Sequence, residues 1–542
     1  WTSATDVILR VATMLTVKGG TGKIVEYFGE GARNMSATSK GTITNMGAEI
    51  GATTSTFGYD DMMDPYLRAT DRGPIADLCK QYAEQLRSDA SVEADPGKYY
   101  DEVHEIDLNT LEPHIVGPHT PDLGRTVSAM SAEVDEKGYP EKLSAALIGS
   151  CTNSSYEDMT RSVSLVRQAK AAGIKAQTSL LVTPGSETIY QTIKRDGILQ
   201  EFEDAGATVL ANACGPCIGQ WKRDDMKKGD KNSILTSYNR NFAKRNDGNP
   251  ETLGFISSPE LVVAMAFGGS MKFNPLTDSL KDKDGNDFKF QPPAGEVLPP
   301  NGYTPQDAGY EVPTMSGEVV ISPTSERLSF LEPFAKQDPA KDYQDLPVLF
   351  KAKGKCTTDH ISQAGPWLKF RGHLDNISNN MFLGATNAFH PETGSGNNPV
   401  TGEENQELNK IARNLRDQGL GWVAFADENV GEGSSREHAA MEPRHMGCRA
   451  FVANSYARIF EANLKKQAVL PFTFADKADY DKIQAKDRIS YEGLDQLAPG
   501  KAVTMTIKHE DGSSDSVQVN HTLNDKEINW FKHGSCLNSL TA

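Results

Sequence analysis

The feature that most constrains the fold is an alternation of short apolar runs and amphipathic runs between residues 145 and 219. Strand-like runs occur at 145–149, 178–182 and 208–211, and helix-like runs with apolar residues at helical spacing occur at 156–172 and 187–196. Strands that alternate with helices are typical of a parallel sheet, in which the loops after the strands gather at one edge. The sequence therefore predicts an α/β fold.

The organisation of the whole chain follows from its length and from changes in composition. At roughly 100–200 residues per domain, about three or four domains fit into 542 residues. We expect a mixed segment at 1–110, an α/β domain at 111–273, a linker rich in Pro, Gly, Asp and Lys at 274–344, and a second compact region at 345–542. No run of about 18 apolar residues is present, so no membrane span is predicted.

The start of the chain has the pattern of a helix start. Ser3 or Thr5 can cap the helix, and Asp6 falls in its first turn. Because the chain opens at Trp1, in the middle of an expected element, we expect the native protein to continue upstream.

The net charge limits the classes of ligand. The chain has 56 Lys and Arg residues and 73 Asp and Glu residues, which gives a formal charge of −17. This argues against a general nucleic-acid binder, because such proteins need a basic surface. If the substrate is an anion, the arginines that hold it must be gathered in one place.

The seven cysteines indicate a reducing compartment, since they are few for this length and odd in number. Cys214-Gly-Pro-Cys217 fits half of a zinc site, a redox dithiol, part of a metal cluster, or two buried thiols. Ala213 stands where a thioredoxin-type motif would carry an aromatic residue.

A third thiol strengthens the cluster interpretation. Cys151 lies at a strand-to-helix junction, where amide donors and the helix dipole favour a thiolate. Because loops at the ends of neighbouring parallel strands converge, Cys151 can reach the Cys214–Cys217 pair. Three thiolates without a fourth suit an iron–sulfur cluster with one open iron, a Lewis acid, whereas structural zinc normally has four protein ligands.

Two loops combine arginine with other polar residues. Asn239, Arg240 and Arg245 lie in a loop without helical or strand period, which favours a carboxylate-binding loop over ordinary surface arginines. A glycine-rich turn that contains Ser434, Ser435 and Arg436 follows the apolar strand predicted at 422–426. Such a turn binds anions at a helix start, and Ser434 is a helix cap or, with a stabilised alkoxide, a base.

Other candidates are isolated acidic and basic residues. Asp359, His360 and Arg371 can form a polar cluster, although a lone histidine is often structural. Asn45 and Glu49 lie among small residues, where a glutamate is costly to bury unless it is paired or functional. The alternative is that Glu49 reaches solvent.

Six motifs, taken in order, resemble the aconitase family in its mitochondrial type, over essentially the whole chain. They are Asn45-Met-Gly-Ala-Glu49-Ile, Gly149-Ser-Cys151-Thr-Asn-Ser, Ala213-Cys214-Gly-Pro-Cys217-Ile, Ser237-Tyr-Asn239-Arg240-Asn-Phe, Thr357-Thr-Asp359-His-Ile-Ser and Gly433-Ser434-Ser435-Arg436-Glu-His. The resemblance implies three-layer α/β domains with parallel sheets around an iron–sulfur cluster, and a linker-connected C-terminal α/β swivelling domain. Residues 111–273 would be the cluster-binding domain, and 1–110 the remainder of a second domain.

The resemblance also assigns roles to the candidate residues. Cys151, Cys214 and Cys217 would bind a 4Fe–4S cluster, and Asn45 and Asn239 would hydrogen-bond around it. Arg240, Arg245, Arg371 and Arg436, assisted by Ser435, would hold the substrate carboxylates. Glu49 would contact the hydroxyl group at the open iron, Ser434 would be the base, and Asp359 would support the site.

The implied activity is that of a hydro-lyase, an aconitate hydratase that converts citrate to isocitrate through cis-aconitate in the tricarboxylic acid cycle. The expected protein is a monomer in the mitochondrial matrix, or alternatively in a bacterial cytoplasm, with no membrane or nucleic-acid partner. Alternatives are a homocitrate or homoaconitate hydratase of lysine biosynthesis, an RNA-binding iron-regulatory relative, and a structural zinc or thiol protein.

Two departures from the family pattern are visible. The family's first domain, with its Asp–His proton-donor pair, would lie upstream of Trp1. Ser36-Ala-Thr-Ser-Lys-Gly precedes Asn45 where the family pattern has Ser-Cys-Thr-Gly, so we expect different packing there.

Overall fold

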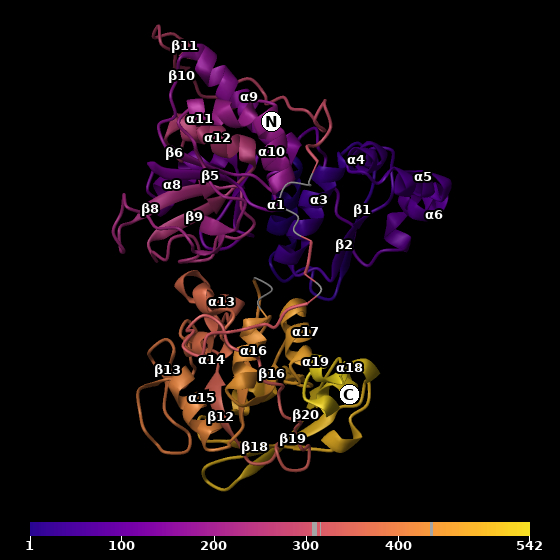
Figure 1. Ribbon diagram of the computed structural model, residues 1–542, viewed down its shortest axis with the longest axis vertical. Helices are drawn as coiled ribbons and strands as arrows, with labels where there is room; N and C mark the ends of the chain where they lie inside the picture. The colour runs from indigo at the N-terminus through magenta and orange to yellow at the C-terminus, as the bar shows by residue number, and fades with distance from the viewer. Residues whose placement is uncertain (306–311, 315, 434–436, 542) are drawn as a thin grey trace. The chain divides into compact units, whose positions relative to one another are not determined.

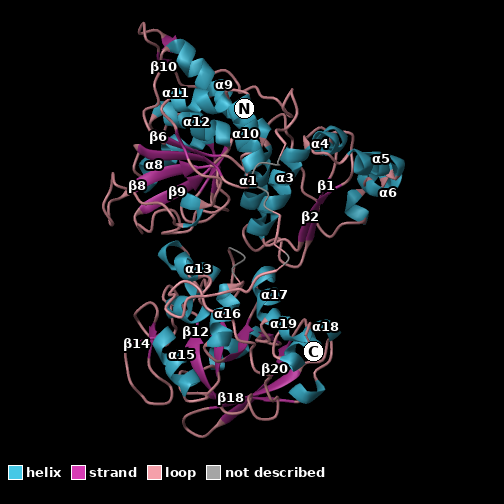
Figure 2. Cartoon of the chain, in the orientation of Figure 1, coloured by secondary structure: helices cyan, strands magenta, loops and turns pink. Residues whose placement is uncertain are grey.

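The computed structural model describes residues 1–305, 312–314, 316–433 and 437–541 (Figure 1). It forms two compact units, Trp1–Thr314 (unit 1) and Met315–Ala542 (unit 2). Both contain helices and strands, which confirms the predicted α/β class (Figure 2). Among the described residues, none of the helices combines the length and the apolar character needed to cross a bilayer.

The main element of unit 1 is a seven-stranded sheet with the order β4-β3-β9-β8-β5-β6-β7. Its strands are β3 (His114–Val116), β4 (Gly124–Thr126), β5 (Leu143–Gly149), β6 (Ser179–Thr183), β7 (Thr208–Val209), β8 (Asn232–Thr236) and β9 (Thr252–Ile256). The five strands from β9 to β7 pair in parallel, and β3 pairs antiparallel with β4 and β9. The parallel sheet predicted from the alternating pattern is confirmed, with β7 shorter than expected.

Helices cover this sheet and supply its core. They are α8 (Val127–Lys137), α9 (Tyr156–Ala172), α10 (Glu187–Arg195), α11 (Ile198–Asp204) and α12 (Pro259–Gly268). α9 has the predicted bounds, because Ser155 and Asp158 form a capping box at its start and Gly173 ends it in a left-handed conformation. Apart from its terminal glycine, α12 is buried along its whole length and packs against α9 and β5.

The first hundred residues form a smaller lobe beside the sheet. Its elements are α1 (Ala4–Leu15), β1 (Ile24–Tyr27), α2 (Glu30–Arg33), α3 (Ala37–Asn45), η1 (Met46–Ile50), β2 (Thr54–Phe57), α4 (Met63–Ala69), α5 (Gly73–Gln81), α6 (Ala83–Leu86) and α7 (Ala90–Ala94). α1 begins after Ser3, which forms a capping box with Asp6, as the sequence predicts. α1 and α3 pack together, so the lobe is held against the sheet through α1.

The predicted linker at 274–344 is partly packed against unit 1. It forms the hairpin β10 (Leu280–Lys281) and β11 (Asp287–Phe288), and the Phe290 side chain lies in the core of the sheet domain. Further along, the Thr304 N–H donates to Thr192 Oγ1 at 3.0 Å. The start of this segment therefore belongs to unit 1.

Unit 2 is built on a closed barrel with the strand order β12-β15-β16-β17-β20-β19-β18. The strands are β12 (Leu346–Lys351), β15 (Trp422–Ala426), β16 (Cys448–Ala453), β17 (Leu470–Phe474), β18 (Arg488–Glu492), β19 (Val503–Lys508) and β20 (Ser514–Asn520). The first four pair in parallel and the last three close the barrel in antiparallel pairs. The strand at 422–426 was predicted, but the closure of the barrel was not.

The helices of unit 2 lie between and after these strands. They are α13 (Thr358–Ile361), α14 (Leu374–Ile377), α15 (Leu408–Asp417), α16 (His438–His445), α17 (Arg458–Lys466), α18 (Asp525–His533) and α19 (Cys536–Ser539), with the 3₁₀ helix η4 (Gly365–Phe370) and the short hairpin β13 (Ser395–Gly396) and β14 (Gln406–Glu407). The fully buried Trp422 anchors this layer, because its Nε1–H donates to the Met446 carbonyl at 2.7 Å.

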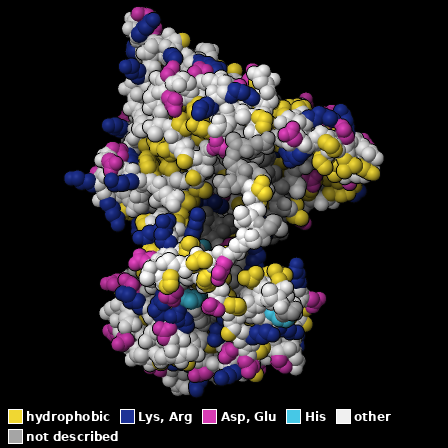
Figure 3. Space-filling model, viewed as in Figure 1, with side chains coloured by type: hydrophobic (Ala, Val, Ile, Leu, Met, Phe, Trp, Pro, Cys, Tyr) yellow, Lys and Arg dark blue, Asp and Glu magenta, His cyan; other side chains and the backbone are white. Residues whose placement is uncertain are grey.

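The surface carries charges of both signs. Acidic and basic side chains are interspersed over unit 1 and over unit 2 on the face drawn in Figure 3. Apolar side chains gather over α5 and α6, where Ile75, Leu78, Tyr82 and Leu86 are between 45% and 50% exposed. The net charge of −17 is therefore carried by a mixed surface.

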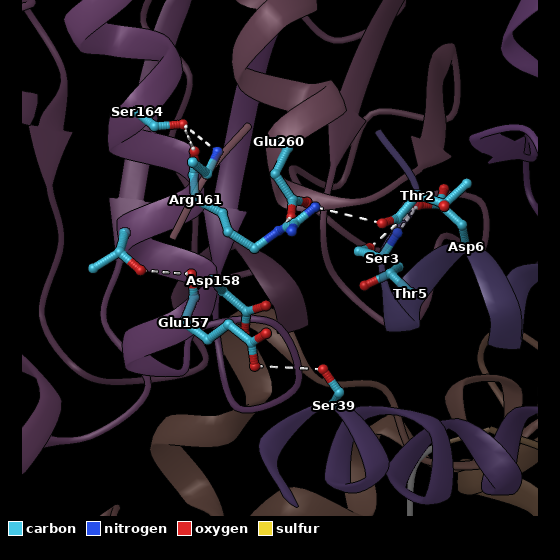
Figure 4. A network of polar contacts seen from close by, with 12 residues as sticks. Thr2, Ser3, Thr5, Asp6, Ser39, Glu157, Asp158, Arg161, Ser164 and Glu260 are labelled. Atoms are coloured by element: carbon cyan, nitrogen blue, oxygen red, sulfur yellow. Dashed lines mark hydrogen bonds and ion pairs between the residues drawn. The ribbon is translucent and has the colours of Figure 1, made fainter. Parts of the chain in front are cut away.

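A network of charged groups links α1, α9 and α12 (Figure 4). Glu260, in the first turn of α12, has no exposed surface and forms an ion pair with Arg161 of α9. Burial raises the pKa of Asp6 and of Asp158, each to about 7, and Glu260 adds to both shifts. Arg161 is thus the cation that compensates the buried Glu260 carboxylate.

We predict that Arg161→Met lowers the unfolding free energy by about 3–5 kcal/mol, because it leaves the Glu260 carboxylate buried without its cation. Adding Glu260→Gln should restore part of the loss. The matched control is Arg167→Met on the same helix: the Arg167–Glu201 pair is exposed, so its loss should cost less than about 1 kcal/mol. Urea unfolding measures all four proteins, and equal losses at the two arginines would contradict this role of Arg161.

Candidate active site

The sequence-predicted residues of unit 1 follow the carboxyl ends of neighbouring strands. Cys151 comes directly after β5, Cys214 and Cys217 lie in the loop after β7, and Asn239 and Arg240 follow β8. Because β8, β5, β6 and β7 are parallel neighbours, these loops emerge at the same edge of the sheet. The edge is the one that the sequence analysis predicted.

The turn that carries Cys151 depends on glycine. Gly149 has φ +125°, and a Cβ there would lie 2.1 Å from the Thr183 carbonyl oxygen. The Cys151 side chain is exposed, and its Sγ lies 3.7 Å from Thr152 Oγ1. Asn45 Nδ2 donates to that same Thr152 oxygen at 2.7 Å. The turn therefore brings Asn45, at the end of α3, beside Cys151.

The two cysteines of the Cys214–Cys217 pair differ in their exposure to solvent. Cys214 is exposed and Cys217 is buried, and neither forms a disulfide. Burial raises the pKa of the Cys217 thiol, and the nearby guanidinium groups of Arg245 and Arg240 oppose that shift. Cys217 Sγ lies 3.9 Å from Asn239 Oδ1. This geometry joins the cysteine loop to the loop after β8.

Glu49 connects the small lobe to the loop after β8. It lies in η1, one turn after Asn45, and only 5% of its surface is exposed. Asn239 Nδ2 donates to Glu49 Oε1 at 3.1 Å, and Arg240 forms an ion pair with the same oxygen at 3.0 Å. Glu49 is therefore a buried, paired carboxylate, and the alternative that it reaches solvent is wrong.

The side-chain positions of the described residues were compared with those of a metal-ion site. Within the described part of the chain, no group of three or more His, Cys, Asp or Glu side chains is placed to hold a metal ion. All seven cysteines are free thiols. The ligand set Cys151, Cys214 and Cys217 thus stays a prediction.

Three of the sequence-predicted residues of unit 2 belong to the segment that follows β12. Asp359 and His360 are in α13, after β12, and Arg371 follows η4, where its carbonyl oxygen lies 2.9 Å from His438 Nε2. The further predicted residues Ser434, Ser435 and Arg436 lie outside the described residues.

Two loops of unit 2 are joined side by side, one leading to Asp359 and the other to Gly433. The Gly431 N–H donates to the Cys356 carbonyl at 2.7 Å, and the Thr358 N–H donates to the Glu432 carbonyl at 3.0 Å. The Glu432 carboxylate forms an ion pair with Lys355 at 2.9 Å. The segment that leads to Ser434 is therefore fixed next to the one that carries Asp359.

Sequence reasoning missed several residues that hold these loops in place. Thr152, Ser237 and Glu432 are small or common polar residues, and none of them was singled out for a role. The signal for the first two was their place directly after apolar strands, within motifs quoted for their neighbours. Glu432 gave no signal beyond its place in the glycine-rich turn.

Comparison with known proteins first defines the class. A model of the aconitase family (aconitate hydratase) matches residues 1–269, and a model of the aconitase C-terminal domain matches residues 346–477. The protein is therefore an enzyme of the hydro-lyase class.

Similar proteins then define the family. The chain is 56% identical to the mitochondrial aconitate hydratase of Gracilaria gracilis, 55% to a probable mitochondrial aconitate hydratase of Caenorhabditis elegans and 56% to the mitochondrial aconitate hydratase of Saccharomyces cerevisiae. In each case the match covers 100% of this chain and 68–69% of the relative. The chain belongs to the aconitase family, as its six motifs predict. The relatives are mitochondrial, which supports the predicted mitochondrial location over a bacterial cytoplasm.

One solved structure is also similar. The crystal structure of 3-isopropylmalate dehydratase from Methanocaldococcus jannaschii matches with a TM-score of 0.23 and 20% identity, over 34% of this chain and 86% of that chain. A likeness of this size supports no conclusion.

We predict that the iron-free, reduced protein reacts with iodoacetamide first at Cys151 and Cys214, and about tenfold more slowly at Cys217, because only a thiolate reacts and Cys217 is buried with a raised pKa. The labelling rate of Cys217 should rise with pH, and it should reach half of its maximum at a higher pH than the rates of Cys151 and Cys214. Peptide mass spectrometry measures each rate. Cys356 is the buried control, since burial raises its pKa to about 12. Equal rates at Cys151 and Cys217 would contradict the geometry.

Proposed function

We propose that this chain supplies the cluster-binding and substrate-binding residues of an aconitate hydratase that converts citrate to isocitrate through cis-aconitate. The observation that carries the proposal is the buried contact of Glu49 with Asn239 and Arg240, beside Cys217. It joins three of the six family motifs at one sheet edge. The similarity of this chain to the aconitate hydratases named above supports citrate, and not homocitrate, as its substrate.

The donor set of unit 1 fits an iron–sulfur cluster. Cys151, Cys214 and Cys217 are unbridged thiols on loops at one sheet edge, and the other four cysteines lie on α5, on α19 and in the core of unit 2. Three thiolates without a fourth would hold a 4Fe–4S cluster with one iron free of protein ligands. When bound, the cluster supplies a Lewis acid that assists loss of the substrate hydroxyl.

The charged residues around this edge fit a tricarboxylate. Arg240 and Arg245 are largely buried arginines, and a buried guanidinium holds a carboxylate through two parallel hydrogen bonds. In a chain of net charge −17, such a local positive group is what draws in an anion. Glu49 is held in place by Asn239 and Arg240 and would contact the substrate hydroxyl group at the open iron.

The remaining steps fall to unit 2. Ser434 would remove the proton from carbon, with Ser435, Arg436 and Arg371 holding carboxylates and Asp359 supporting the site. We further propose residues 111–273 as the cluster-binding domain and 345–542 as the swivelling domain, and a protein that acts as a monomer.

We predict that Ser434→Ala in the full-length protein lowers citrate turnover by about 10²–10⁴-fold, the usual contribution of a positioned base, with the visible cluster absorbance unchanged. Conversion of citrate to isocitrate after anaerobic reconstitution with iron and sulfide measures it. The control is Ser322→Ala, at an exposed serine of the segment that precedes the barrel. Unchanged turnover would reject Ser434 as the base, and a colourless wild-type protein that binds one zinc would reject the whole proposal.

A further inference from the structure

We propose that Ser237 and Asn153 are positioning residues that clamp the Cys151 turn at both of its ends and thereby set how firmly the chain retains its cluster. This inference rests on the proposed function, because it assigns Cys151 to the cluster. Neither residue has a role in the mechanism above.

Both ends of the Cys151 turn form a hydrogen bond with Ser237. The Ser237 Oγ accepts from the Gly149 N–H at 2.9 Å, at the start of the turn. The Ser237 carbonyl accepts from Asn153 Nδ2 at 2.7 Å, at its end. Ser237 and Asn153 have no exposed surface. Water therefore cannot replace either bond, and losing a partner leaves a buried polar group unsatisfied.

The amide of Asn153 is oriented from its other side. Thr5 Oγ1, on α1, donates to Asn153 Oδ1 at 2.7 Å, which leaves Nδ2 directed at the Ser237 carbonyl. Thr5 is also buried. The donor and acceptor ends of the amide are thus fixed by two different elements, so the side chain has one satisfied orientation.

The same serine links two parts of the candidate site. Ser237 lies directly after β8, two residues before Asn239, and its N–H donates to the Leu147 carbonyl of β5 at 2.9 Å. A shift of Ser237 would therefore move the Cys151 turn relative to the Asn239 loop. Residues that orient metal ligands in this indirect way commonly change metal affinity when they are replaced.

The test compares Ser237→Ala and Asn153→Asp with a matched control in the full-length protein. Asn153→Asp keeps an acceptor for Thr5 and replaces the donor to the Ser237 carbonyl with a carboxylate oxygen, which cannot donate when it is ionised. The control is Asn232→Ala, a buried asparagine at the opposite end of β8 that also bonds within the sheet. All three variants should lose thermal stability, since each breaks buried hydrogen bonds.

After anaerobic reconstitution, the two clamp variants should lose the cluster about tenfold faster than wild type, measured by decay of the visible absorbance with a chelator, while Asn232→Ala should lose it at the wild-type rate. Hydrogen exchange of the iron-free proteins gives a second measurement: the amide of Gly149 should exchange faster in Ser237→Ala and Asn153→Asp only.

The outcomes separate this inference from the proposed function. Cluster loss at the wild-type rate in both clamp variants, or equal acceleration in Asn232→Ala, would overturn the positioning role while the proposed function stands. A wild-type protein that takes up no iron would overturn the proposed function and the role together, even if hydrogen exchange shows the clamp.

Discussion

The parallel pairing of β8, β5, β6 and β7 is the constraint on which the candidate site depends. It brings segments that are far apart along the chain, such as Gly149 and Ser237 at a separation of 88 residues, to one edge of a sheet. Side chains then fix the Cys151 loop: Ser237 Oγ accepts from the Gly149 N–H, Asn153 Nδ2 donates to the Ser237 carbonyl, and Asn45 Nδ2 donates to Thr152 Oγ1. The positions of the strand ends therefore determine where the cysteines lie, more than the cysteine motifs do.

Unit 1 also buries carboxylates, and it stabilises them in two ways. At the site, Glu49 is surrounded by an amide and a guanidinium, so a carboxylate is retained in an almost solvent-free position. Between α1, α9 and α12, the buried Glu260 carboxylate forms an ion pair with Arg161, and burial raises the pKa values of the neighbouring Asp6 and Asp158 to about 7. The first arrangement keeps a charge available for chemistry, whereas the second holds helices together.

Much of the fold could be predicted from the sequence, because the alternation of apolar runs depends on local periodicity. α9 and β15 have the predicted bounds, and α1 starts at its predicted cap. The barrel closure in unit 2 could not be predicted, since it depends on the antiparallel pairing of β12 with β18, whose paired residues are 141 and 143 positions apart and give no local signal. The site residues were found through motifs, but Ser237 and Glu432 act through backbone contacts with distant loops, and no spacing in the sequence encodes those contacts.

The bond between Thr5 and Asn153 has a consequence for the Cys151 turn. It joins residues that are 148 positions apart along the chain, and it depends on the packing of α1 beside the sheet. Without this packing, the Asn153 amide that holds the Cys151 turn would lack the partner that orients it. α1 therefore influences the Cys151 turn from outside the sheet, although none of its residues belongs to the six family motifs.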